Sequence, residues 1–490
     1  MFDERMKLSN AMNGRRVILV LLCIGACAFN CLCQVRIEAR LADQVSRSRL
    51  LGQVRDLVSF GPRIGGTSSG EKSSSYVARK FREAGYNPSV IRDPLRLTFE
   101  FKAWTLAIED PPGLRKLIRN EWIGGFSPTV AETTSELVYV RDLGKATRAV
   151  AAGKAILTES SFAETEYLRM AKSGATCILA ISPHLGDAYS DWAYISDLPS
   201  SQKNPIPLFN LSYRNGDSLM HALADSHKVV VRFSTETVID STRPTTVAAT
   251  LVGESDKYYI VCAHGDSDSG GPGADDNASG VSVVLETARI LKKLVATHEL
   301  TKPRCSIKFI AWGADNFSAE NYVKNHAREL GKILGVLNLD EVGVGATRNC
   351  LYFEPNDVEH NDSLLKVLDS LAVDYVGKKG FWSEATTNPS QGGADSYVFL
   401  QEYLRALKVP QTKIPSVTIY TAAWNELKPI PQTPGWKSKA WHGPKDTVYV
   451  DYSPYYHSSL DVPERTTEKE PYNMIVAAKA VGIALLRLAW

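Results

Sequence analysis

Apolar residues recur with a helical period near the start of the chain. Between about residues 45 and 86, Leu50, Val54 and Leu57 repeat at helical spacing. The turn at residues 61–66, GPRIGG, interrupts this pattern with three glycines and a proline. The segment therefore predicts two helices joined by a turn.

From about residue 103 the pattern changes to short apolar runs separated by turn residues. One helix is predicted at residues 167–174. The strands predicted around it are 136–140, 153–157, 176–181 and 206–209. Such a mixture of short strands and a helix indicates a smaller α+β domain.

Beyond residue 247, apolar runs of strand length alternate with helical patterns. The predicted strands are 247–252, 258–263, 306–312, 333–339 and 414–420, and the predicted helices are 281–294 and 472–488. Strands that alternate with helices form a largely parallel sheet with helices on both faces. We therefore predict an α/β fold with a mostly parallel twisted sheet, into which the smaller α+β domain is inserted.

The N-terminal segment differs from the rest of the chain. Arg15 and Arg16 precede an apolar run at residues 17–29, which is short for a membrane span. A cationic segment, an apolar run and small residues predict a secretory signal peptide. A lipoprotein leader with a lipidated Cys27 and an uncleaved anchor are the alternatives. Each predicts an extracytoplasmic protein that touches a membrane only through its leader or a lipid anchor.

Composition excludes some classes of function. The chain has 490 residues, enough for two or three domains, and 44% of them are hydrophobic, as in an ordinary globular protein. Its formal net charge is +2, so no electrostatic footprint for nucleic acid is evident. Four of the cysteines lie in the leader. The others, Cys177, Cys262, Cys305 and Cys350, stand mostly in apolar surroundings and are predicted to be buried thiols.

Candidate chemistry gathers where the predicted strand 258–263 ends. His264 follows the strand directly, Asp266 comes two residues later, and a glycine-rich loop then delivers Asp275 to the start of a helix. Ligands gather at the carboxyl ends of strands in such units. Imidazole and carboxylate suit zinc or a similar divalent metal. Asp266 is placed to accept the second ring proton of His264 and fix its tautomer.

The segments HGDS (residues 264–267) and GADDNASG (residues 273–280) together resemble the metal-binding core of peptidase family M28. That family comprises zinc exopeptidases, among them aminopeptidases, and also the transferrin receptor ectodomain, which has no peptidase activity. The GPRIGG turn is similar to the opening of M28 catalytic domains, and the smaller domain resembles the protease-associated domain of many secreted members. The leader predicted above covers residues 1–34, and the resemblance implies peptidase segments at 35–102 and 237–490 with the insert at 103–236.

The resemblance also implies a pair of metal sites with a shared carboxylate. It assigns Asp275 as the bridge and His264 with Asp340 as the other ligands of one site. For the second site it implies a histidine from a W/Y-H-x-x-x-D motif, and both His442 and His457 stand in one. We prefer His457, because the turn after it leads into the last predicted helix.

The chain departs from the family pattern at Asp315 and Asn316. Members usually have two glutamates there, the first a general base and the second a metal ligand. Asp315 is one methylene shorter than glutamate, and Asn316 offers only a neutral carbonyl oxygen. We therefore expect one tight zinc site and a weakened second one. A histidine common in the family is also missing after Asp395.

Two functions follow from these expectations. The first is an extracytoplasmic metal-dependent exopeptidase, most readily an aminopeptidase, that hydrolyses peptide bonds with a metal-activated water while Asp315 moves the proton. The second is a binding or structural protein on a peptidase scaffold, impaired at its second metal site. The first predicts a peptide or protein as the substrate.

Overall fold

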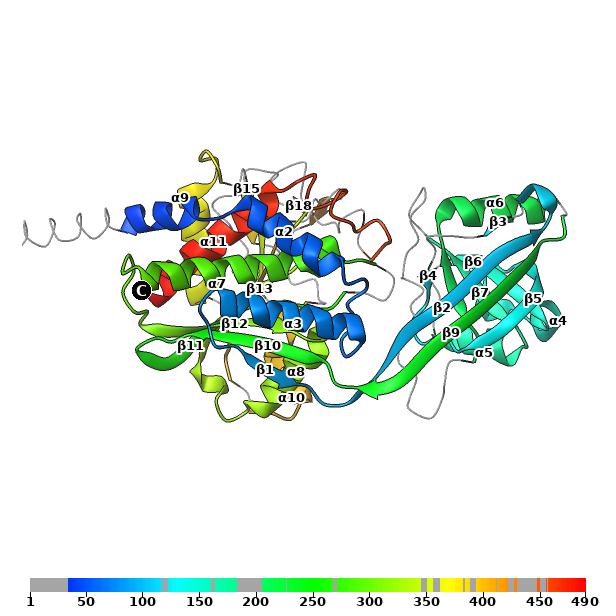
Figure 1. Ribbon diagram of the computed structural model, residues 1–490, viewed down its shortest axis with the longest axis horizontal. Coiled ribbons are helices and arrows are strands. Elements are labelled where there is room, and N and C mark those ends of the chain that lie inside the picture. The colour runs from blue at the N-terminus through cyan, green and yellow to red at the C-terminus, as the bar shows by residue number, and fades with distance from the viewer. Residues whose placement is uncertain are drawn as a thin grey trace, which may run out of the picture.

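The computed structural model describes residues 34–114, 116–117, 122–159, 164–182, 205–225, 227–267, 271–344, 350–355, 362–381, 384–387, 394–410, 412–421, 427–429, 447–449, 455 and 457–490. These residues form two lobes, which two long neighbouring strands connect (Figure 1). The apolar run of the predicted leader and His442 lie outside the described residues.

The larger lobe is built on a mixed sheet. Its strands, in spatial order, are β1 (Ser89–Arg92), β10 (Thr245–Leu251), β12 (Cys305–Trp312), β11 (Ser255–His264), β13 (Ile333–Leu339), β16 (Ser416–Tyr420), β14 (Cys350–Pro355) and β15 (Glu384–Thr387). The central strands β12, β11, β13 and β16 are parallel, as are β14 and β15. The pairs β1–β10, β10–β12 and β14–β16 are antiparallel. The predicted α/β class is confirmed, with the parallel order strongest at the centre.

Helices cover both faces of this sheet, as Figure 1 shows. One face carries α2 (Arg47–Val58), α3 (Ser68–Glu83), α7 (Gly280–Ala296), α9 (Asp362–Tyr375) and α11 (Tyr472–Ala489), and the other carries α8 (Asp315–Asn325), η6 (Asp395–Phe399) and α10 (Gln401–Ala406). Strand β11 alternates between the two cores, with Val261 and Ala263 in the first and Ile260 and Cys262 in the second. This alternation explains why the strand is apolar throughout.

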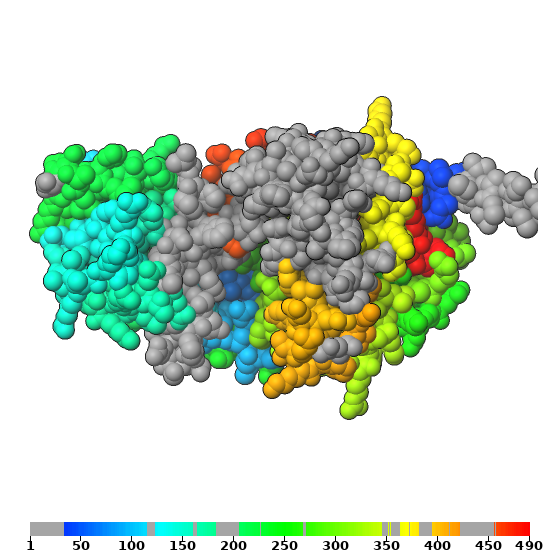
Figure 2. Space-filling model, turned by 180° about the vertical axis from the view of Figure 1, so that it is seen from behind, coloured from blue at the N-terminus to red at the C-terminus, as the bar shows by residue number. Residues whose placement is uncertain are grey.

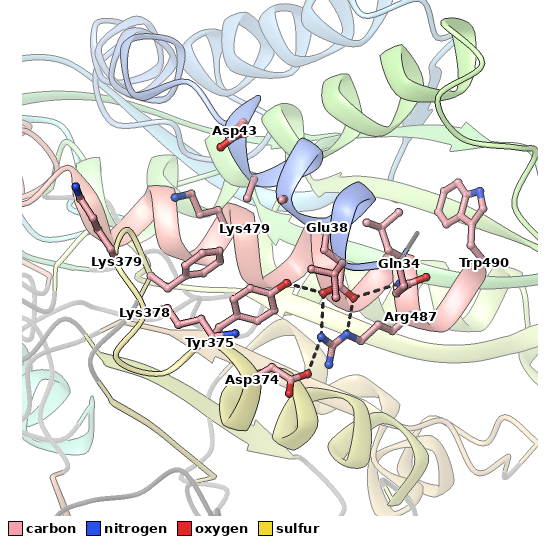
Figure 3. Close-up of a pocket in the computed structure, with 15 residues that line it drawn as sticks. Gln34, Glu38, Asp43, Asp374, Tyr375, Lys378, Lys379, Lys479, Arg487 and Trp490 are labelled. Carbon is pink, nitrogen blue, oxygen red and sulfur yellow. Dashed lines mark hydrogen bonds and ion pairs between the residues drawn. The ribbon is translucent and has the colours of Figure 1, made fainter. Parts of the chain in front are cut away.

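The C-terminal helix α11 holds the two ends of the described chain together. Among the described residues it is the one helix long and apolar enough to cross a membrane, but 72% of its apolar window is buried inside the protein, where it packs on α7. Near its end, Arg487 donates two hydrogen bonds to Glu38 of the helix at residues 34–43, and Tyr375 of α9 donates a third (Figure 3). These elements border a cavity of about 700 Å³.

The smaller lobe has its own sheet and its own cores. The strands in spatial order are β3 (Lys116–Leu117), β2 (Arg96–Asp110), β9 (Val230–Thr242), β5 (Val130–Tyr139), β6 (Lys154–Glu159), β7 (Cys177–Ile181), β8 (Leu208–Leu211) and β4 (Trp122–Ile123). Helices α4 (Arg148–Ala151) and α5 (Glu164–Lys172) pack on one face and α6 (Tyr213–Ala224) on the other. Seen from the opposite side, this lobe is coloured cyan and green and forms the left end of the view (Figure 2).

Every strand and helix predicted from apolar periodicity has a counterpart among these elements. The structure also has short elements that lie outside the two main sheets and their covering helices. They are η1 (Pro112–Leu114), η2 (Leu143–Lys145), η3 (Ala274–Ser279), η4 (Leu330–Lys332), β17 (Leu427–Pro429) and β18 (Thr447–Tyr449). Among the elements that the sequence did not predict are β2, β9, β14, α6, α8, α9 and α10. Cys177 and Cys262 are buried free thiols, as predicted, whereas Cys305 is free but half-buried. The identity of the inserted lobe as a protease-associated domain stays a prediction.

Candidate metal centre

The candidate site lies at the carboxyl ends of the central parallel strands. His264 is the last residue of β11 and is paired with Trp312, the last residue of β12. On the other side of β11, Cys262 is paired with Asn338 of β13, so Asp340 leaves β13 level with His264. Parallel strands that end together bring their following residues to one edge of the sheet.

His264 lies among three carboxylates. Its Nε2 is 3.0 Å from Oδ1 of Asp276 and 3.4 Å from Oδ1 of Asp340. On the far side of the ring, Nδ1 is 3.3 Å from Oδ1 of Asp266, which fits the predicted role of Asp266 in fixing the tautomer. One ligand atom each from His264, Asp276 and Asp340 lie within 4.8 Å of one another, close enough to hold a single metal ion.

His457 reaches the same carboxylate from the other side. Its Nε2 is 3.2 Å from Oδ2 of Asp276, whose Oδ1 faces His264. The Asp276 carboxylate therefore lies between two imidazoles. A carboxylate that offers one oxygen to each of two histidine-bearing sites has the arrangement of a bridging ligand in a two-metal centre.

Asp275, the bridge expected from the sequence, lies elsewhere. Its Oδ1 accepts a hydrogen bond of 2.7 Å from the backbone N–H of Gly343, and its Oδ2 is buried without a hydrogen-bond partner among the described residues. The backbone at Asp276 is extended, with φ −106° and ψ 93°, although the helix begins around it. Neighbouring side chains point in opposite directions in extended backbone, so only one aspartate of the pair can face the histidines. The structure brings Asp276, not Asp275, to that position.

The two departures from the family pattern lie beside each other at the start of α8. The backbone N–H of Asp315 donates to Oδ1 of Asp266, 3.0 Å, which ties α8 to the partner of His264. The Nδ2 of Asn316 is 3.4 Å from Oδ2 of Asp315, and its Oδ1 is buried without a hydrogen-bond partner among the described residues. Asn316 thus has a buried, neutral oxygen beside Asp315 that is free to take a ligand.

Asp395 is a further acid of the site. It begins η6, is fully buried, and lies close enough to Asp315 for that acid to raise its pKa. With the Asn338 amide oriented to satisfy both neighbours, Nδ2 donates to Oδ2 of Asp395 and to the carbonyl of Cys262, each at 3.2 Å. The sequence marked this position for a missing histidine and did not reveal its contact with Asp315, because η6 lies far along the chain.

The electrostatics of the site are dominated by negative charge. Burial raises the pKa of Asp275, Glu341 and Asp395 well above the carboxyl range, and neighbouring acids raise it further. For Asp276, burial alone would also raise the pKa, but hydrogen bonds from both histidines outweigh it and hold the pKa below its ordinary value. Burial alone would lower the pKa of His264, yet the surrounding carboxylates raise it well above the usual range.

These residues fit a divalent cation. Imidazole nitrogens and carboxylate oxygens converge, and Oδ1 of Asp340 is buried without a hydrogen bond although it faces the cluster. Buried acids repel one another unless they take up protons or a cation, and the raised pKa values express the first option. Metal binding would release those protons. Asp315, Glu341 and His457 also adopt positive φ, at 35°, 46° and 46°, and such backbone strain clusters at functional sites.

Comparison with known proteins supports this assignment. The model of "Peptidase family M28" matches residues 246–474, which include His264, Asp276, Asp340 and His457. An aminopeptidase of Pseudomonas aeruginosa strain UCBPP-PA14 is 27% identical over 333 residues, which are 62% of this chain and 58% of that protein. The chain thus spans less than two thirds of that relative.

Two matches from Bacillus subtilis, one in sequence and one in structure, extend the comparison. Aminopeptidase YwaD of strain 168 is 26% identical over 360 residues, 70% of each chain. The solved structure of BSAP, a zinc aminopeptidase, superposes with a TM-score of 0.61 at 19% identity and covers 91% of this chain and 95% of its own. That likeness shows a shared fold. Together with the converging ligands, the match makes residues 246–474 similar to peptidase family M28.

Proposed function

We propose that this protein is an extracytoplasmic, metal-dependent aminopeptidase. The observation that carries the proposal is the carboxylate of Asp276 between Nε2 of His264 and Nε2 of His457, at the carboxyl edge of a parallel sheet. A bridging carboxylate flanked by imidazoles is the core of a hydrolytic two-metal site. The relatives named aminopeptidases support the reaction class, and the apolar leader with Arg15 and Arg16 supports the location.

The ligand sets are unequal. His264, Asp276 and Asp340 would hold the first zinc ion, with one imidazole and two carboxylates. Asp276 and His457 would hold the second, completed only by the neutral Oδ1 of Asn316. Bound cations supply Lewis acidity and favour ionisation of water at neutral pH. The second ion is expected to bind more weakly, because one anionic ligand is replaced by an amide.

Asp315 is the group proposed to move the proton. Its carboxylate lies at the start of α8, with its own backbone N–H fixed on Asp266. Burial and the neighbouring Asp315 raise the pKa of Asp395 well above its ordinary value, which favours the protonated form of Asp395. Asp315 is then the carboxylate of this acid pair that we propose accepts a proton from a water molecule.

A binding protein on the same scaffold is the second candidate, and Asn316 favours it. The side-chain amide of Asn316 donates a hydrogen bond to the carboxylate of Asp315. The residue that would complete the second metal site therefore takes up one oxygen of the proposed base. A base weakened in this way could leave metal and peptide binding without turnover. Fold alone does not decide between these functions.

The test combines metal analysis with hydrolysis. Purified protein would be dialysed, assayed for zinc, and offered aminoacyl anilides and matched peptides with a blocked amino group. An aminopeptidase cleaves the free series, ignores the blocked series, and loses activity with chelator. Zinc binding with neither series cleaved would favour the binding protein, and absence of zinc after reconstitution would reject the metal centre itself.

The smaller lobe and the leader complete the proposal. We assign the lobe to the protease-associated class, since β5, β6, β7 and β8 with α5 and α6 form an α/β unit inserted between two segments of the peptidase lobe. N-terminal mass spectrometry of the mature protein tests the leader. Loss of the residues before about Cys27, or a diacylglycerol mass on Cys27, is expected, whereas an intact Met1 on cytoplasmic protein would reject export.

A further inference from the structure

The loop that carries Asp276 is held from its amide side by Asp461. The backbone N–H groups of Asp275 and Asp276 donate to Oδ1 and Oδ2 of Asp461, at 2.8 and 3.0 Å. The backbone carbonyl of Asp461 also accepts from the N–H of Ala274, 3.1 Å. Asp461 is 2% exposed, and both its carboxylate oxygens are used in this way. One residue therefore takes the amides of three successive loop residues.

The same loop is held from its carbonyl side by Arg63. This fully buried guanidinium donates to the carbonyls of Pro272, 2.7 Å, and Gly273, 2.9 Å. Its Nε donates to the carbonyl of Gly265, 3.2 Å, the residue directly after His264. Arg63 thus joins the end of strand β11, which carries one metal ligand, to the loop that carries another.

Gly273 lies between the contacts of Arg63 and those of Asp461, and its surroundings leave no space for a side chain. Gly273 adopts φ +64°, a conformation that favours glycine. A β-carbon at this position would lie 2.4 Å from the carbonyl oxygen of Asp276 and 2.5 Å from Cβ of Ser267. The backbone that presents Asp276 is therefore packed on both sides as well as hydrogen bonded.

We propose that Arg63 and Asp461 are positioning residues of the metal centre, which hold the Asp276 carboxylate between His264 and His457 before any cation binds. Neither side chain has a hydrogen bond to a side chain of the proposed ligands; both act through backbone groups. The inference rests on the proposed metal centre. Its consequence is a metal affinity that depends on two residues outside the ligand set.

The expected loss of zinc affinity follows from how Asp461 fixes the loop that carries Asp276. Without Asp461, two amides lose their acceptor, and the extended backbone at Asp276 is no longer fixed against its neighbours. A cation would then have to order the loop when it binds. Loss of such supporting contacts typically lowers metal affinity about 10–100-fold. Because Asp276 faces both histidines, both ions are expected to bind more weakly.

The experiment measures zinc affinity by competition with a chromophoric chelator, on the full chain. Asp461→Asn keeps the size of the side chain but places an NH₂ group against one loop amide. Arg63→Lys keeps the charge but cannot reach three carbonyls. Each is expected to bind zinc about 10–100-fold more weakly than wild type. Either variant alone is sufficient if the other does not fold.

Matched controls come from an ion pair far from the site. Glu38 is buried, Arg487 is half-buried and both are multiply hydrogen bonded, so Glu38→Gln and Arg487→Lys should lower the melting temperature and leave zinc affinity unchanged. If the Asp461 and Arg63 variants lose stability as the controls do and still bind zinc like wild type, the positioning role is refuted. If wild type itself binds no zinc, the proposed metal centre fails instead, and the two failures are distinguishable.

Discussion

Asp275 and Asp276 show how the backbone decides which of two identical side chains reaches a ligand position. Both are buried or nearly so, and both lie in the loop that follows β11. The extended conformation at Asp276 directs its carboxylate to the histidines, while Asp275 accepts from the N–H of Gly343. No side-chain property distinguishes the two residues, so residue type alone could not have assigned the bridge.

Substitution of each aspartate by asparagine separates the two positions. We expect Asp276→Asn to weaken zinc binding by more than about 10-fold, because a bridging carboxylate loses its charge and one of its two acceptor oxygens. Asp275→Asn can still accept from Gly343 N–H through its amide oxygen and should keep zinc affinity near wild type. Chelator competition measures both. Loss of zinc binding in Asp275→Asn alone would restore the assignment suggested by the sequence resemblance.

The pair Asp315 and Asn316 is best tested by replacement of both with glutamate. Asn316→Glu supplies an anionic ligand to the second ion, and Asp315→Glu restores the longer reach of the base. We expect the double variant to bind a second zinc more tightly and to raise kcat/KM by up to the 10²–10⁴-fold that a positioned base contributes. Each single change should do less, because a base and a fully ligated metal pair act together.

The opposite outcome has a definite meaning. If wild type hydrolyses peptides rapidly and the double variant is slower, the contact between Asp395 and Asp315 has become the working arrangement of this site. Inactivity of both forms despite two bound zinc ions would favour the binding protein.

At the scale of elements, apolar periodicity predicted some of the strands and helices that form the cores, but it missed others, such as β14, α6, α8 and α9. Strand β11 and helix α7 are buried over most of their length, and the sequence predicted both. Strands β2 and β9 were not predicted. The strand β2 does not alternate regularly between buried and exposed positions, and the second half of β9 has no buried residue. Their conformation depends on pairing with each other over thirteen residue pairs and not on a strong local pattern.

The candidate site was predictable where ligands follow strand ends and unpredictable where they arrive from remote loops. His264 and Asp340 follow β11 and β13, so the parallel order brings them together. The contact of Asp395 with Asp315 and that of Asp461 with the Asp275 and Asp276 amides join segments 80 and 185–186 residues apart. His457 lies in contact with Asp276, and His442 is outside the described residues.

The N-terminal helix at residues 34–43 supplies a prediction about pH. Burial alone would raise the pKa of Glu38, but hydrogen bonds from Arg487 and Tyr375 outweigh it and hold the pKa below the ordinary value. A carboxyl with a lowered pKa stabilises the folded state above its unfolded pKa, about 4.3, and this contribution is lost as pH falls through the folded value. Glu38→Gln should therefore lower the free energy of unfolding by about 3–5 kcal/mol near pH 7.

The expected sign can be checked by urea unfolding across pH. The difference in free energy of unfolding between wild type and Glu38→Gln should be largest at neutral pH. It should shrink as pH falls below about 4, where Glu38 takes up a proton. A difference that is constant from pH 7 to pH 3 would show that the loss comes from packing and not from the charge. Zinc affinity serves as the internal control, since Glu38 lies on the helix at residues 34–43 and not at the carboxyl ends of the strands.

For the whole molecule, the arrangement of two lobes implies that the larger one holds the metal centre without help from the smaller. The apolar clusters on either face of the main sheet contain no residue from 98–240. His264, Asp276, Asp340 and His457 also lie outside that range. The smaller lobe has its own apolar clusters. Stability and metal binding of the larger lobe should therefore be separable from the smaller one.

Excision of the smaller lobe tests this separation. Leu97 and Ser241 are directly paired in the antiparallel ladder of β2 and β9, so their Cα atoms are about 4.5–5.5 Å apart and a two-residue Asn-Gly turn can join them in place of residues 98–240. We expect a soluble protein with a single cooperative unfolding transition and wild-type zinc affinity. Hydrolysis of a small aminoacyl anilide should remain within about 10-fold, well below the 10²–10⁴-fold loss of a catalytic base. A folded variant that no longer binds zinc would show instead that the smaller lobe supports the metal centre, through the junction where β2 and β9 leave the main sheet.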